Sequence, residues 1–254
     1  MNFLLLIKTL GALLGLFGIS MCVPALVSYY YDDGAQLAFI TSALVTLVTA
    51  ALLYVCARSA RAPLSPRGAF LVVALCWLTA TVFGALPYYL SETYPTIIDA
   101  WFESASGFTT TGASVLSDLE SLPPSILLWR SLTQFLGGMG IVVLSLAVLP
   151  LLGVGGMDLF KAESPGPTSD KITAKVSETA RALWLVYILL TFVQAVLLYI
   201  FGMSMFDAIN HALTTMATGG FSTKNSSIAS FNSPEIETII TFFMFLAGVN
   251  FLYH

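Results

Sequence analysis

The chain has 254 residues, of which 57% are apolar and only 9% carry charge, and its formal net charge is −4. Its mean hydropathy is +0.87, whereas roughly a quarter of the residues of a water-soluble protein are charged. This composition excludes a soluble enzyme or a nucleic-acid-binding protein and indicates an integral membrane protein. A membrane enzyme would need paired ionisable residues at mid-membrane depth, and the apolar segments offer none, so we expect no enzymatic activity.

Six segments are long and apolar enough to cross the hydrocarbon core of a membrane, which takes about 20 helical residues. They are Phe3–Ser28, Gln36–Ala57, Ala69–Leu90, Ser125–Leu152, Arg181–Met203 and Glu235–His254. The sequence therefore predicts an all-α integral membrane fold with six transmembrane helices, surrounded by membrane lipid.

The basic residues predict the orientation of these helices. With a cytoplasmic amino terminus, eight of the ten Lys and Arg residues lie on the cytoplasmic side, as the positive-inside rule requires. These eight are Lys8, Arg58, Arg61, Arg67, Lys161, Lys171, Lys175 and Arg181. The acidic residues gather at the outer face, where they would raise the local concentration of cations. We predict a multi-pass membrane protein with its amino terminus inside the cell.

Two short segments, Ile97–Phe108 and Met205–Met216, follow the third and fifth predicted spans. Each has about 12 residues, or roughly 18 Å of helix, which is too short to cross the membrane. Thr96 and Ser204 can cap their amino-terminal ends. Each segment must therefore enter the membrane and return, and both do so from the outside. Such non-helical backbone is tolerated at this depth only where it is buried in protein or lines a wet cavity.

The chain thus divides into repeated units of the potassium-channel type, in which a helix, a re-entrant pore loop and a second helix follow one another. Residues 1–60 form a leading transmembrane helix pair, and residues 61–155 form the first repeat. A cytoplasmic linker rich in Gly, Pro and charge covers residues 156–180, and residues 181–254 form the second repeat, which is truncated at its end.

A polar stretch with a Thr-Gly step follows each short segment. A dehydrated alkali cation needs several oxygen ligands, which backbone carbonyls supply without net charge, as in potassium-channel filters. Glycine permits the unusual backbone that points successive carbonyls inward. The sequence therefore predicts an ion-binding site for K⁺ at two matching sets of residues. These are Thr110, Thr111, Gly112 and Ala113 in the first stretch and Ala217, Thr218, Gly219 and Gly220 in the second.

Three ionisable residues near these stretches are candidates for a supporting role. Arg130 lies one to two turns into the fourth predicted helix, where an unpaired charge is costly. Glu103 or Asp99 can pair with it, and Glu103 can instead bond to the backbone of the loop. His211 is isolated and is interpreted as a packing residue. Gly137 and Gly138 do not follow a strand, so we attribute them to close helix packing rather than to a nucleotide loop.

Three longer runs carry a specific resemblance. They are Phe135–Val143 (FLGGMGIVV), Leu149–Met157 (LPLLGVGGM) and Ala162–Pro167 (AESPGP). With the two polar stretches, they resemble the TrkH family of bacterial potassium-uptake membrane subunits, in the Trk/Ktr/HKT superfamily. The resemblance covers essentially the whole chain. It implies a potassium-selective pathway gated by a cytosolic nucleotide-binding subunit, TrkA, and homodimers of complete units. It also implies that carbonyls of Thr110, Thr111, Ala217 and Thr218 coordinate K⁺.

The chain departs from this family in one respect. Family members contain four helix–loop–helix units, whereas this chain contains two, so its loops alone cannot surround an ion. Either a carboxy-terminal half or a second copy of the chain would have to supply the other two loops. We predict potassium uptake with two of four filter loops in this chain. The alternative is a truncated, non-conducting membrane scaffold. No covalently bound cofactor is expected, and potassium is the transported ligand.

Overall fold

The computed structural model describes residues 3–59, 66–148 and 169–249, and all the regular secondary structure in these ranges is helical. In chain order the elements are α1 (Phe3–Ser20), α2 (Cys22–Tyr31), α3 (Gln36–Cys56), α4 (Pro66–Gly84), α5 (Leu86–Leu90), α6 (Ile97–Phe108), α7 (Pro124–Val148), α9 (Ser169–Ile200), α10 (Met205–Met216), the 3₁₀ helix η2 (Ser227–Phe231) and α11 (Pro234–Gly248). The predicted all-α fold is confirmed for these residues.

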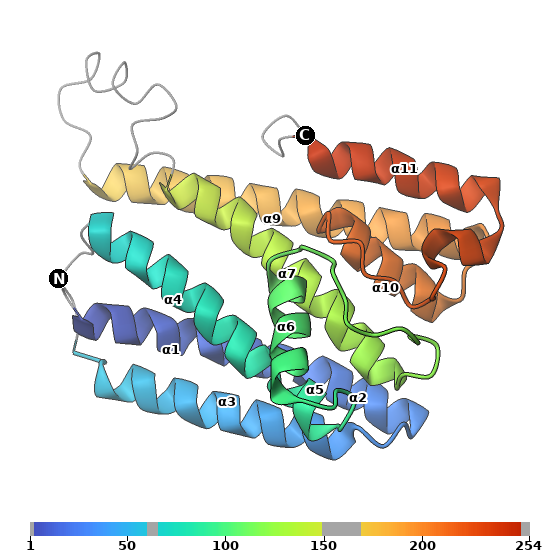
Figure 1. Ribbon diagram of the computed structural model, residues 1–254. Helices are drawn as coiled ribbons and strands as arrows, with labels where there is room; N and C mark the ends of the chain where they lie inside the picture. The colour runs from blue at the N-terminus through green and yellow to red at the C-terminus, as the bar shows by residue number, and fades with distance from the viewer. Residues whose placement is uncertain (1–2, 60–65, 149–168, 250–254) are drawn as a thin grey trace, which may run out of the picture.

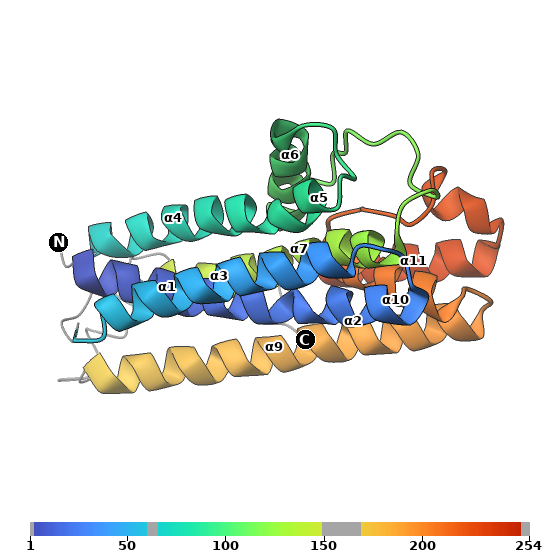
Figure 2. The ribbon, with the colours of Figure 1, turned by 90° about the horizontal axis from the view of Figure 1, so that it is seen from below.

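The long helices run side by side, whereas the short helix α6 crosses them at a steep angle (Figure 1). The first residues of α1, α4 and α9 and the last residues of α3 gather at one end of the bundle, as both views show (Figures 1 and 2). Lys8 and Arg58 meet at this end, where the Lys8 ammonium donates to the Arg58 carbonyl at 3.5 Å. The predicted cytoplasmic residues Arg61 and Lys161 lie outside the described residues, as do the side chains of Arg67, Lys171 and Lys175.

Four helical stretches within the described ranges are long and apolar enough to cross a membrane, judged by length and composition. They are Phe3–Tyr31, Gln36–Cys56, Phe70–Leu90 and Thr179–Ile200. These stretches coincide with four of the six predicted spans. The other two predicted spans are helical as α7 and α11, and their predicted ends at Leu152 and His254 lie outside the described residues. The count of six spans therefore stays a prediction.

Glycines allow α1 and α3 to approach each other closely. A Cβ atom on Gly11 would lie 2.8 Å from the Tyr54 nitrogen and 2.9 Å from the Ala50 oxygen, both in the backbone of α3. Lipid is as apolar as a leucine side chain, so helices in a membrane associate through close packing rather than through the hydrophobic effect. The glycine at position 11 therefore permits the contact that joins the first two long helices.

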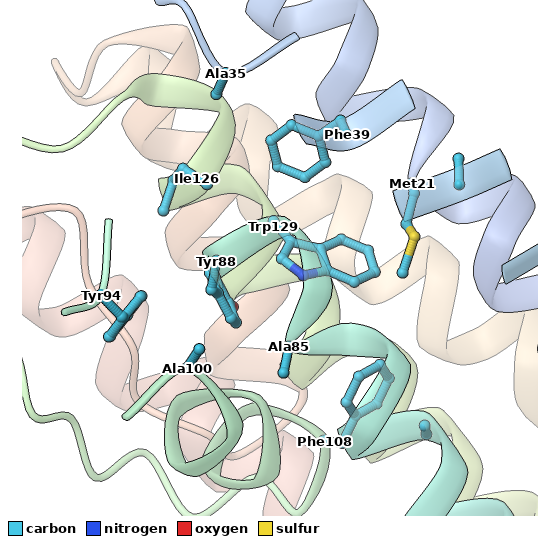
Figure 3. Close-up of a cluster of buried hydrophobic side chains, with 12 residues drawn as sticks. Met21, Ala35, Phe39, Ala85, Tyr88, Tyr94, Ala100, Phe108, Ile126 and Trp129 are labelled. Atoms are coloured by element: carbon cyan, nitrogen blue, oxygen red, sulfur yellow. The ribbon is translucent and has the colours of Figure 1, made fainter. Parts of the chain in front are cut away.

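A cluster of aromatic side chains connects this helix pair to the short helix α6 (Figure 3). Trp129 of α7 is fully buried, and its ring centroid lies 6.3 Å from that of Phe39 and 6.4 Å from that of Phe108. Its indole N–H donates to the carbonyl of Gly84, at the end of α4, at 3.0 Å. Phe108 is the last residue of α6, so this cluster fixes the point from which the first polar loop starts.

The contact at Gly11 leads to a testable prediction. Gly11→Ala should destabilise the protein by about 1–3 kcal/mol, because the new methyl group would overlap the backbone of α3. Gly15→Ala is the matched control, since a Cβ atom there would lie 3.9 Å from the Ala50 side chain, an ordinary contact. Denaturant unfolding in mixed micelles measures both variants. Equal stability of the two variants would contradict the proposed packing.

Candidate functional site

The two short helices begin in the same way. α6 and α10 have the predicted bounds, and the predicted caps are confirmed. Thr96 Oγ1 accepts from the Asp99 N–H at 3.1 Å, and Ser204 Oγ accepts from the Asp207 N–H at 3.0 Å. Each cap hydroxyl also donates to the carboxylate of the same Asp, at 2.7 Å and 2.8 Å respectively. This reciprocal arrangement satisfies amino-terminal donors of both helices.

The two helices also end in the same backbone turn. Thr110 and Thr218 both adopt the left-handed region, at φ 54° and 53°. Gly112 and Gly220, each two residues later, also have positive φ, at 76° and 83°. In the sequence of this chain, the Thr-Gly step of Thr111 and Gly112 matches that of Thr218 and Gly219. The backbone instead pairs Gly112 with Gly220, one residue further along, because conformation rather than residue identity relates the two turns.

The segments that follow these turns are here named the first loop (residues 109–116) and the second loop (residues 217–226). They touch each other at a pair of glycines. A Cβ atom on Gly112 would overlap the carbonyl oxygen of Gly219. Thr111, Ala113, Thr218 and Gly220 are exposed on the loops, whereas Ala217 and Gly219 are buried. The structure therefore brings together the two sets of predicted ion-binding residues and leaves one flank of each loop open.

Helix α7 supports both loops with one face. A Cβ atom on Gly137 would overlap the Phe108 carbonyl at the end of α6, and one on Gly138 would lie 2.9 Å from the Ala217 Cα. Gln134 Oε1 accepts from the Phe221 N–H at 3.0 Å. These positions and Arg130 recur every three or four residues, so they lie on the same side of the helix. The close packing expected for Gly137 and Gly138 is confirmed.

A buried ion pair joins α6 to α7. Arg130 Nε donates to Glu103 Oε1 at 2.8 Å, and the side chains are 2% and 0% exposed. Of the two predicted partners of Arg130, the structure selects Glu103, and Asp99 instead takes part in the helix cap. Isolated charges cannot be held in such a site, so the pairing explains how both residues are tolerated.

Both members of the pair also bind the loops. Glu103 accepts from the Ser114 hydroxyl at 2.9 Å and from the Val115 N–H at 3.3 Å. Arg130 donates to Ser114 Oγ at 3.3 Å and to the Ser222 carbonyl at 3.2 Å, and its guanidinium carbon lies 4.2 Å from the Phe221 ring centroid. One arginine therefore contacts the first loop and the second loop together.

His211 has a structural role that the sequence interpretation missed. It occupies the same place in α10 that Glu103 occupies in α6, four residues after the capping Asp. Its Nδ1 lies 2.8 Å from the Asp207 carbonyl, so we assign the proton to Nδ1. Its Nε2 then accepts from the Ser222 hydroxyl at 2.9 Å. The signal that could have found it is the equal spacing of Glu103 from Ser114 and of His211 from Ser222.

Asn225, in the second loop, binds two residues that lie just after the first loop. Its Oδ1 accepts from the Leu119 N–H at 2.6 Å, and its Nδ2 donates to Asp118 Oδ1 at 3.2 Å. The hydrogen bond from Asn225 and one from Ser121 hold the pKa of Asp118 below its usual value, because they favour the ionised carboxylate. The link thus joins segments that are far apart in sequence at the exposed surface.

The two loops carry threonine and serine hydroxyls beside their backbone carbonyl groups. No group of three or more His, Cys, Asp or Glu residues within the described ranges could hold a metal ion. The exposed flanks of the loops instead present backbone carbonyls and threonine hydroxyls. Capped short helices, paired loops with left-handed turns and helices long and apolar enough to cross a membrane together indicate an integral membrane protein of the ion-transport class.

Comparison with known proteins specifies this class. Residues 35–254 match the family model TrkH, described as a cation transport protein, and the chain belongs to this family. It is 46% identical to the Trk system potassium uptake protein TrkH of Escherichia coli K12 over 256 residues, which cover 100% of this chain and 53% of that protein. It is 38% identical to TrkG of the same organism, over 95% of this chain and 50% of that protein.

A solved structure shows the same fold. The crystal structure of the potassium transporter TrkH from Vibrio parahaemolyticus matches with a TM-score of 0.90 and 40% identity, over 100% of this chain and 51% of that chain. The chain spans about half the length of the curated relatives that it matches, and this half is the amino-terminal one.

The ion pair generates the first prediction for this site. Arg130→Met should cost about 3–5 kcal/mol of stability, because it leaves the Glu103 carboxylate buried without a partner. The double variant Arg130→Met with Glu103→Gln should lose much less than the sum of the two single losses. Reversible unfolding of all three variants in mixed micelles measures this coupling. Additivity within about 0.5 kcal/mol would show that the two residues act independently.

The hydrogen bonds of Asn225 generate the second prediction for this site. Asn225→Ala should raise the pKa of Asp118 toward the usual aspartate value, because the main hydrogen bond to its carboxylate is lost. The sign follows from the lowered pKa: the interaction is present above the usual aspartate pKa and is lost as pH falls through the lowered value. Carboxyl-carbon NMR of labelled protein in nanodiscs measures the titration. Ser226→Ala, an exposed change in the same loop, should leave it unaltered.

Proposed function

We propose that this chain supplies two of the four filter loops of a potassium-uptake pathway in a bacterial cytoplasmic membrane. The observation that carries the proposal is the pair of capped, re-entrant-length helices that end in the same left-handed turn and bring Gly112 against Gly219. Membership of the TrkH family and the potassium-uptake names of the relatives support it.

In the proposed pathway, K⁺ exchanges its water shell for carbonyl oxygens of Thr110, Thr111, Ala217 and Thr218, beside Gly112 and Gly219. Thr110 and Thr218 hold the left-handed conformation in which consecutive peptide groups change direction. The carboxyl ends of α6 and α10 precede these residues directly, and a helix carries a partial negative charge there, which favours a cation. Potassium moves passively down its electrochemical gradient, with no covalent chemistry.

Helix α7 contacts the second loop through a glycine, whereas the glycine at the matching place in α11 has no such neighbour among the described residues. The run Leu246-Ala247-Gly248 of α11 matches Leu136-Gly137-Gly138 of α7 in its leucine and its last glycine. Gly138 contacts Ala217 in the second loop, whereas a Cβ atom on Gly248 would meet nothing within 4 Å among the described residues. This difference supports a further loop at α11. A carboxy-terminal half is the proposed source, because the relatives are about twice as long. A second copy of this chain is the alternative.

The proposal extends to the rest of the assembly. Complete units would form homodimers, and TrkA, the cytosolic nucleotide-binding subunit, would regulate them from the side where the amino terminus lies. The meeting of Lys8 and Arg58 at one end of the bundle supports that orientation, since basic residues concentrate on the cytoplasmic side of membrane proteins.

Rubidium flux into proteoliposomes tests the proposal. The chain is reconstituted alone and together with a separately expressed carboxy-terminal half of a TrkH protein, with barium as the blocker. We expect barium-sensitive flux only when the added half is present. Flux from the chain alone would mean that two copies close the pathway. No flux in either sample, with folding confirmed by circular dichroism, would favour the scaffold function instead.

A single substitution tests the filter itself. Gly112→Ser should reduce the preference for potassium over sodium about tenfold, because a side chain in this left-handed position costs about 1–2 kcal/mol and would overlap the Gly219 carbonyl. Gly202→Ser is the matched control, since Gly202 also has positive φ, at 105°, but a Cβ atom there meets nothing within 4 Å. Competing rubidium and sodium uptake measures both variants. An unchanged preference in Gly112→Ser would remove this residue from the filter.

A further inference from the structure

Gln134 lies on α7 between the two loops, and only one of the two polar atoms of its amide has a hydrogen-bond partner among the described residues. The side chain is 0% exposed. Its Oε1 accepts from the Phe221 N–H at 3.0 Å, whereas its Nε2 has no hydrogen-bond partner within the described ranges. Buried polar groups without a partner are uncommon and call for an explanation. Packing of the aliphatic stem alone does not require an amide at this position.

The contacts of the amide place it against both loops at once. A Cβ atom on Gly219 would overlap the Gln134 amide, so the second loop lies directly on this side chain. A Cβ atom on Gly112 would lie 3.7 Å from Gln134 Nε2, so the first loop is close as well. The amide is planar and rigid, and the hydrogen bond to Phe221 fixes its position. Its size therefore limits how closely the two loops approach each other.

We propose that Gln134 is a positioning residue that sets the separation between the first loop and the second loop and thereby tunes discrimination among monovalent cations. The inference rests on the proposed function in taking these loops as parts of a cation filter. Gln134 does not touch the ion in this account. It acts through Gly219 and Phe221, whose backbone it holds, and sub-ångström changes in this backbone alter how well carbonyls fit a dehydrated cation.

The chain provides a matched control for a purely structural role. Gln194 on α9 is also 0% exposed, and neither its Oε1 nor its Nε2 has a hydrogen-bond partner within the described part of the chain. The atoms nearest to a Cβ atom on Gly112 or on Gly219 belong to the other loop or to Gln134, not to Gln194. Gln194→Met therefore removes an equally buried amide away from the loops. A general effect of burying methionine in place of glutamine would appear in both variants.

Two measurements on Gln134→Met, Gln134→Glu and Gln194→Met test the proposal. The first is the sodium-to-potassium permeability ratio of the assembly with the added carboxy-terminal half. The second is the distance between spin labels at Val115→Cys and Lys224→Cys, measured by pulsed electron resonance in a background with Cys22, Cys56 and Cys76 replaced by Ser. The label distance reports on the two loops whether or not the assembly conducts.

Gln134→Met should broaden or shift the label distance and change the permeability ratio about tenfold, because the Phe221 N–H loses its buried acceptor. Gln134→Glu retains this acceptor and should keep the distance of the unsubstituted protein, and Gln194→Met should alter neither quantity. If Gln134→Met does not fold, Gln134→Asn, which withdraws the amide by one methylene, carries the same expectations.

The inference is overturned if the label distance is unchanged in Gln134→Met, or if Gln194→Met changes this distance equally. An altered distance with an unchanged permeability ratio overturns the part that concerns cation discrimination. Absence of barium-sensitive flux from the unsubstituted assembly would be a failure of the proposed function. The label distance would then still decide whether Gln134 sets the separation of the loops.

Discussion

The ion pair between Arg130 and Glu103 is the interaction on which the arrangement of both loops depends. An unpaired charge is costly at a buried position within a membrane protein, so neither residue is tolerated without the other. Their pairing fixes α6 against α7, and their remaining hydrogen-bonding groups bind Ser114, the Val115 N–H and the Ser222 carbonyl. Part of the irregular backbone of the loops is thereby satisfied by protein groups.

Glycine makes the rest of this arrangement sterically possible. The carbonyl of Phe108 reaches α7 only because Gly137 has no side chain, and the first loop reaches the second only because Gly112 has none. Along one face of α7, the hydrogen-bonding residues Arg130 and Gln134 are followed by Gly137 and Gly138. The polar groups therefore hold the loops in place, and the glycines permit the close contacts between them.

Sequence predicted best where a local chemical signal was present. The bounds of α6 and α10 follow from a cap residue, an acidic residue three positions later and an apolar face, and all of these are local. The register of the loops could not be read from the shared Thr-Gly step, because the left-handed conformation falls on Thr110 and Thr218 and then on Gly112 and Gly220. A β-branched residue seldom adopts this conformation, so composition gave no warning.

The supporting residues show a second limit. Arg130 was recognisable because a charge within an apolar segment is conspicuous, and the sequence offered two acids of the preceding short helix, Asp99 and Glu103, as its partner. Gln134 carries no comparable signal, since a lone glutamine is usually a satisfied core residue, and the signal for His211 is only its spacing from Ser222, which equals that of Glu103 from Ser114. Their contacts with Ser222 and Phe221 join segments 11 and 87 residues apart. Only the folded arrangement of α7 and α10 brings those partners together.

The chemistry of the two supports has a consequence for the proposed cation pathway. Behind the first loop, the charges of Glu103 and Arg130 cancel. Behind the second loop, the tautomer assigned to His211 is neutral, with its Nδ1 donating to Asp207 and its Nε2 accepting from Ser222. The Glu103–Arg130 pair and His211 therefore add no net charge beside the proposed cation path, and the carboxylate that does bind the second loop is that of Asp207, which accepts from the Thr223 hydroxyl. A carboxylate beside the cation path, without a positive charge to balance it, would bind a cation too tightly to release it. Conduction requires sites that an ion can also leave. In the proposed pathway, the electrostatic attraction then comes from carbonyl dipoles and from the carboxyl ends of α6 and α10. Each helix end favours a cation more strongly the more directly it points at that cation.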